Sequence, residues 1–131
     1  MSTIDSLNPL RSLKLISHEQ YLNNFITFYE KRSFPNVLML SGKKGIGKYT
    51  LVNHFLNYIF NKNTKTPYDL VNKSINENSP FYKSILNNSS QDILYLNINN
   101  KKVKIDDIRN LRNILSKKTF NSNPRFIIID E

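Results

Sequence analysis

The stretch "LMLSGKKGIGKYT", residues 38–50, decides the fold class of this chain. It holds all 3 glycines of the sequence, Gly42, Gly45 and Gly47, whereas glycine makes up about 7% of an average protein. With Lys48 they fit the first seven positions of G-x-x-x-x-G-K-[ST], the Walker A phosphate-binding loop. Such a loop requires glycine because its backbone adopts positive φ angles and approaches an anion closely.

The chemistry that this pattern predicts is anion binding. Successive backbone N–H groups of the loop point into one concavity, at the positive N-terminus of the helix that follows. Lys48 would reach the β- and γ-phosphates as a point charge. A glycine-rich turn that only joins a strand to a helix is the alternative. The predicted nucleotide-binding residues are Gly42, Lys43, Lys44, Gly45, Ile46, Gly47, Lys48, Tyr49 and Thr50.

The eighth position of the pattern departs from the rule. It holds Tyr49, where a Ser or Thr would supply the hydroxyl that coordinates Mg²⁺. A phenol on a long rigid ring cannot place its oxygen at the same point, and Thr50 is rotated by about 100° around the helix. The sequence therefore favours phosphate binding over hydrolysis.

Strand and helix patterns alternate on both sides of the loop. Short apolar runs predict strands at 36–41 and 92–98 and in the closing "PRFIIIDE". Helices are expected after a capping box at Ser17, after Gly47, after Ser79 and near Asp106. Their inward faces should carry Leu22, Phe25, Ile26 and Tyr29 in the first, Leu51, Val52, Phe55, Leu56, Ile59 and Phe60 in the second, and Ile108, Leu111 and Leu115 in the last. This order predicts an α/β fold, a parallel sheet flanked by helices with right-handed crossovers.

A second candidate motif is "FIIIDE", residues 126–131, where an apolar strand ends in two acids. In this Walker B pattern Asp130 would hold Mg²⁺ through water. Glu131 would be the catalytic residue that orients or activates the attacking water. A buried strand that happens to end in acids is the alternative.

Composition limits the function classes. The 131 residues amount to one domain, and the net charge of +9 permits contact with nucleic acid or nucleotide phosphates, although scattered lysines decide nothing alone. The absence of cysteine excludes disulfides, thiolate zinc sites and cysteine nucleophiles. No apolar run is long enough to span a membrane, and no secretion signal is evident, so a cytoplasmic protein without a membrane partner is expected.

Three segments share their order with a known family. They are "SHEQYLNNFITFYEKRSFPNVLMLS" at 17–41, "GKKGIGKYTLVNHFLNYIF" at 42–60 and "KVKIDDIRNLRNILSKKTFNSNPRFIIIDE" at 102–131. The chain resembles the N-terminal AAA+ domain of bacterial clamp-loader subunits, and most nearly the delta-prime subunit of DNA polymerase III. The family's His-Glu pair matches His18-Glu19, its proline before the first strand matches Pro35, and its "IxxDxIRxLxxxL" segment matches 105–115 with the Asp shifted by one.

The resemblance implies a P-loop NTPase fold, with residues 1–131 as the N-terminal part of an AAA+ domain that stops after the Walker B strand, before the lid and collar domains. It implies a five-subunit ring with gamma/tau and delta subunits, which opens a sliding clamp and places it on primer-template DNA. The expected ligand is ATP or ADP, with or without Mg²⁺. Delta-prime subunits often carry altered nucleotide sites and act as stators, which agrees with Tyr49.

Two other functions remain open at this point. One is a catalytically active AAA+ ATPase such as the gamma/tau motor subunit, although the absence of its zinc-binding cysteines argues against it. The other is a simple basic nucleic-acid-binding module.

Overall fold

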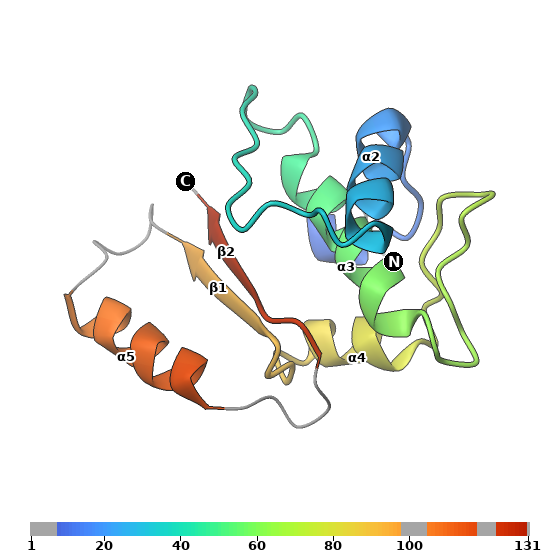
Figure 1. Cartoon of the computed structure of the whole chain (residues 1–131). Coiled ribbons are helices and arrows are strands. Elements are labelled where there is room, and N and C mark those ends of the chain that lie inside the picture. Colours follow the sequence, from blue (N-terminus) through green and yellow to red (C-terminus); the bar gives the residue numbers. More distant parts are fainter. Residues whose placement is uncertain (1–7, 98–104, 118–122, 131) are drawn as a thin grey trace. The chain divides into compact units, whose positions relative to one another are not determined.

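A computed structural model describes residues 8–97, 105–117 and 123–130. The chain divides into two compact units, one ending at Ser89 and the other beginning at Ser90. The first unit contains the 3₁₀ turn η1 (Pro9–Arg11) and the helices α2 (Glu19–Glu30), α3 (Lys48–Asn61) and α4 (Pro80–Leu86); the second contains β1 (Ile93–Asn97), α5 (Ile105–Ser116) and β2 (Phe126–Asp130), as Figure 1 shows. Within the described ranges, no helix combines the length and the apolar character needed to cross a membrane.

An aromatic cluster forms the core between α2 and α3, which lie side by side (Figure 1). The ring of Phe55 stacks on Phe34 at a centroid distance of 5.1 Å and meets Phe25 edge-on at 5.6 Å. The helical stripes are largely as predicted: Leu22, Phe25, Leu51, Phe55, Leu56 and Ile59 are buried, and Ile26, Tyr29, Val52 and Phe60 are half-buried. Helical periodicity therefore identified this core.

The beginning of α2 differs from the prediction. The capping box at Ser17 is wrong, because α2 begins at Glu19 with His18 as its N-cap, in the left-handed conformation at φ 69° and without a side-chain cap. The beginning of α4 is as predicted, with Ser79 as N-cap and Pro80 in the first turn. The side chain of His18 makes no cap bond to α2, and its ring instead contacts the carbonyl of Ile46.

The second unit confirms that its strands run parallel. β1 and β2 run parallel with Ile93 opposite Phe126 and Leu96 opposite Ile129. The strand predicted at 36–41 is wrong: the structure gives no strand there, and Val37 and Met39 are 88% and 85% exposed. A strand requires a ladder of hydrogen bonds to a neighbour, and in the part of the chain that the structure describes β1 and β2 pair only with each other.

The helix near Asp106 forms as predicted, but its apolar face is not buried as expected. Asp106 and Asp107 lie in the first turn of α5, where their charges suit the helix dipole. No residue of α5 is buried. The expectation that Ile108 and Leu115 point inward is wrong, since they are 57% and 47% exposed, whereas Leu111 is half-buried. An apolar stripe is buried only where another layer covers it, and periodicity does not supply that layer.

A row of buried polar side chains on α3 was not predicted. Asn57 is completely buried, donates from Nδ2 to the carbonyl of Asn53 at 2.9 Å, and accepts at Oδ1 from Asn61 Nδ2 at 3.2 Å. Asn53 reaches the carbonyl of Pro9. The row allows a polar face of α3 to be buried, because most of its amide groups find partners on the same helix.

His54 links three segments of the first unit. It is fully buried, with Nε2 2.8 Å from the carbonyl of Ser12 and Nδ1 2.7 Å from the hydroxyl of Tyr68. A carbonyl only accepts, so Nε2 carries the proton and Nδ1 accepts from Tyr68. Burial lowers the pKa of His54 below its ordinary value of 6.5, although the bond to Ser12 opposes the shift. Burial also raises the pKa of Tyr68.

Lowering the pH is expected to destabilise the first unit through His54. Below 6.5 the unfolded chain takes up a proton that the folded site refuses, so stability is complete above 6.5 and falls as the pH drops towards the lower pKa of the folded state. Urea midpoints at pH 7.0 and 5.5 measure this for the unmodified chain and for His54→Gln, which cannot titrate. The difference between the two midpoints should shrink in the variant; an equal difference would contradict the assignment.

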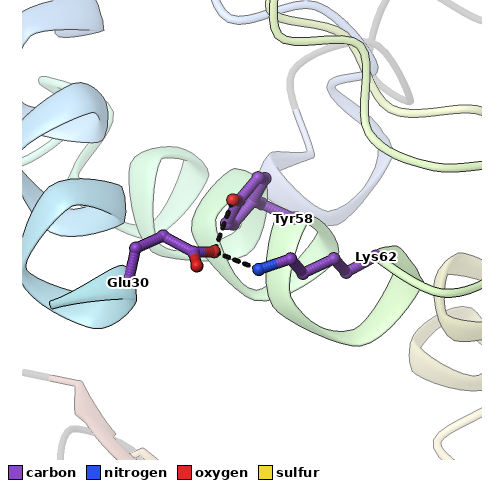
Figure 2. Close-up of polar contacts among 3 residues, drawn as sticks. All are labelled: Glu30, Tyr58 and Lys62. Carbon is purple, nitrogen blue, oxygen red and sulfur yellow. Dashed lines mark hydrogen bonds and ion pairs between the residues drawn. The ribbon is translucent and has the colours of Figure 1, made fainter. Parts of the chain in front are cut away.

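A polar contact also joins the ends of α2 and α3 (Figure 2). The carboxylate of Glu30 accepts from the Tyr58 hydroxyl at 2.6 Å and forms an ion pair with Lys62. The hydrogen bond from Lys62, followed by that from Tyr58, lowers the pKa of Glu30. Burial, followed by the bond to Glu30, raises the pKa of Tyr58 to about 12.

Candidate phosphate-binding site

The glycine loop, residues 42–47, lies in the first unit and leads directly into α3. Gly45 has φ 82° and Gly47 has φ 98°, both in the region that L side chains rarely adopt. A Cβ added at Gly45 would meet nothing within 4 Å. The requirement for glycine at Gly45 therefore comes from its backbone angle, and a side chain there would cost about 1–2 kcal/mol.

Lys48 begins α3 and folds back over the loop. Its Nζ donates to the carbonyl of Gly42 at 2.5 Å and lies 3.3 Å from the carbonyl of Lys43. The loop is tightened further by the bond from the Ile46 N–H to the Lys43 carbonyl at 3.3 Å. The ammonium group thus already lies against the loop that it was predicted to serve, with its charge on loop carbonyls.

The two positions after Lys48 are less open than the loop itself. Residues 42–46 are exposed, whereas Tyr49 and Thr50 in the first turn of α3 are half-buried. Lys43 and Lys44 stand on the exposed part, so their charges are accessible to an anion approaching from solvent.

His18 also contacts the loop, which sequence reasoning missed as a contact. Its Nε2 lies 2.7 Å from the carbonyl of Ile46, and a Cβ added at Gly47 would be 3.7 Å from the same ring. The residue was noted only as part of a His-Glu pair. A histidine before a helix carries no signal that its ring reaches a loop 28 residues later, because that contact depends on tertiary packing.

The acidic strand end lies in the second unit. Asp130 ends β2 and is half-buried, and its Oδ2 accepts from the Tyr95 hydroxyl at 2.7 Å. Glu131, the predicted catalytic residue, lies outside the described residues. The loop and Asp130 are thus described separately, each within its own unit. Among the described residues, no group of three or more His, Asp or Glu is arranged to hold a metal ion.

The comparison with protein families concerns the glycine loop and the acidic strand end together. A family described as DNA polymerase III, delta subunit matches residues 17–131, from the turn before α2 through β2. No curated protein and no solved structure matches the chain. The matched range includes both the glycine loop and Asp130, the two motifs on which the sequence resemblance was based. The chain therefore belongs to the DNA polymerase III delta-subunit family of clamp-loader domains.

Proposed function

We propose that this chain is a delta-prime-like clamp-loader subunit that holds ATP or ADP at a degenerate phosphate loop. The observation that carries the proposal is the local geometry of the loop, in which Gly45 and Gly47 take positive φ angles and α3 begins at Lys48. Backbone donors at a helix N-terminus next to a lysine are suited to phosphate oxygens. The nucleotide-binding residues would be those of the loop, from Gly42 to Thr50.

The residues present fit a nucleotide better than they fit its metal. To bind phosphate, Lys48 would exchange the carbonyls of Gly42 and Lys43 for phosphate oxygens. A bound Mg²⁺ would neutralise phosphate charge, and Asp130 could hold it only through water. Tyr49 cannot supply the inner hydroxyl, so Mg²⁺ should add little to affinity.

The family supports the proposed partners. Under this proposal the chain assembles with gamma/tau and delta subunits in a ring that places a sliding clamp on primer-template DNA. Both units would then be parts of one AAA+ domain. Its function would lie in assembly, with the nucleotide acting as a structural ligand.

Lys48→Ala is expected to weaken ATP binding about tenfold or more, because it removes a charge-assisted contact to phosphate. Calorimetric titration of ATP, with and without Mg²⁺, measures the effect. Lys83→Ala is the control, since it removes the same charge from an exposed position on α4. Absence of binding by the unmodified chain, or equal losses in both variants, would contradict a working phosphate loop.

A catalytically active ATPase is the second candidate, because both Lys48 and the strand-end Asp130 are present. Its test is ATP turnover in the assembled clamp loader. Turnover at this subunit that Lys48→Ala abolishes would favour the enzyme. Assembly with partner subunits without turnover would favour the structural subunit.

A further inference from the structure

We propose that His18 is a positioning residue that holds the phosphate loop in its anion-binding form, an inference that rests on the proposed function. Its Nε2 lies 2.7 Å from the Ile46 carbonyl. The carbonyl can only accept, so the ring donates from Nε2. Because His18 is also the N-cap of α2, this bond ties the start of one helix to the loop that precedes another.

The bond sets the direction of a neighbouring N–H group. The described part of the chain contains no cis peptide bond. In a trans peptide the carbonyl of Ile46 and the N–H of Gly47 point in opposite directions. Since His18 draws that carbonyl towards itself, the N–H of Gly47 points away from His18. Gly47 is the N-cap of α3, so this group belongs to the donors that a helix N-terminus offers to an anion.

The contact of Lys48 with the loop differs from that of His18, because phosphate binding would break it. Lys48 also holds the loop, through the carbonyls of Gly42 and Lys43, but it does so with the ammonium group that a phosphate would claim. The contact of His18 uses neither this ammonium group nor a loop N–H. It therefore survives when phosphate enters, and His18 maintains the loop in the empty and the occupied state.

Residue 18 has two roles that substitution can separate. Its φ of 69° requires a residue that tolerates the left-handed conformation, and its ring supplies the donor. Asparagine is well suited to that conformation, but its amide nitrogen lies too near the backbone to replace Nε2. Glutamine suits the conformation less well, but its amide nitrogen reaches about as far as Nε2. If only the backbone conformation of residue 18 matters, His18→Asn should be the better tolerated variant. If the donor matters, His18→Gln should be.

The glycines provide a direct readout, because all 3 of them belong to the loop. Selective ¹⁵N-glycine labelling of the full chain should give three backbone signals, whose positions and amide exchange rates report the loop without any ligand. Gln20→Ala serves as the control for a change in the exposed first turn of α2. Thermal unfolding confirms that each variant is folded, and ATP titration measures binding.

His18→Gln is expected to keep the glycine signals and the ATP affinity. His18→Asn should shift the Gly47 signal, speed its amide exchange about tenfold and weaken ATP binding about threefold to tenfold, as loss of one hydrogen bond implies. Preserved signals in His18→Asn, or equal disturbance in both variants, would overturn the donor role. If the unmodified chain bound no ATP, the proposed function would fail, while the glycine signals would still decide whether His18 positions the loop.

Discussion

Phe55→Ala is expected to lower the free energy of unfolding of the first unit by about 3–5 kcal/mol. The side chain is buried, and three aromatic rings surround it: Phe25, Phe34 and Tyr29. Removing the ring loses both its transfer free energy and its contacts, because the neighbouring rings cannot all move into the space. Since α3 begins at Lys48, directly after the glycine loop, the loss should also loosen the start of this helix.

Urea titration followed by circular dichroism measures the effect of Phe55→Ala. Phe28→Ala is a matched control, because Phe28 is on the adjoining helix α2 but is exposed. The control should change the free energy of unfolding by less than about 1 kcal/mol. Similar losses in the two variants would mean that the aromatic cluster is not the core of this unit.

Asn57→Asp is expected to destabilise the first unit by about 3 kcal/mol at pH 7, although the two side chains have nearly the same shape. The introduced carboxylate would be fully buried, and one of its oxygens would face the carbonyl that Asn57 Nδ2 now donates to, which belongs to Asn53. Two acceptors would then meet without a proton between them. The hydrogen bond from Asn61 to Oδ1 would compensate only in part.

The pH dependence of Asn57→Asp separates this cause from a change of shape. Burial raises the pKa of the introduced carboxyl above its usual value of about 3.9. The cost is therefore complete above that raised pKa and disappears as the pH falls below the usual value, where the group is neutral in both states. Unfolding free energies are compared with the unmodified chain at each pH, which cancels the contribution of His54.

The exposed Asn24 provides the control for the buried charge, because Asn24→Asp places the same carboxylate on the surface of α2. It should change stability by less than about 0.5 kcal/mol at any of these pH values. A pH-independent loss in Asn57→Asp would show that the buried row tolerates charge and that only packing was disturbed.

Local patterns predicted much of the fold. The apolar stripe of α3 and the glycines before it were sufficient to place a helix after the loop, because residues at i, i+3 and i+4 share one face in any α-helix. The apolar runs of β1 and β2 were also predicted as strands of a parallel sheet, but which strand each pairs with was not predicted, and only the structure shows that they pair with each other. The strand expected at 36–41 was wrong, although its apolar run is no weaker than theirs.

In the candidate site, too, local patterns identified some residues and missed others. Gly45, Gly47 and Lys48 were singled out from their spacing alone, and the structure gives Gly45 and Gly47 positive φ angles, while phosphate binding stays a prediction. The contact from His18 was not predicted, and neither was the burial of Asn57. Asparagine is usually exposed and histidine is intermediate in burial, and the sequence neighbours of these two residues give no sign of what they contact.

The sequence by itself determined the local elements of this protein: where glycine must permit positive φ, which helix faces are apolar and which charges stand at helix ends. These depend on each residue and its near neighbours along the chain. Only the tertiary structure decided which polar groups are buried on α3, which carbonyl His18 holds, and that residues 36–41 form no ladder. Hydrogen bonds between distant segments depend on which elements meet in space, and periodicity carries no information about the identity of a partner.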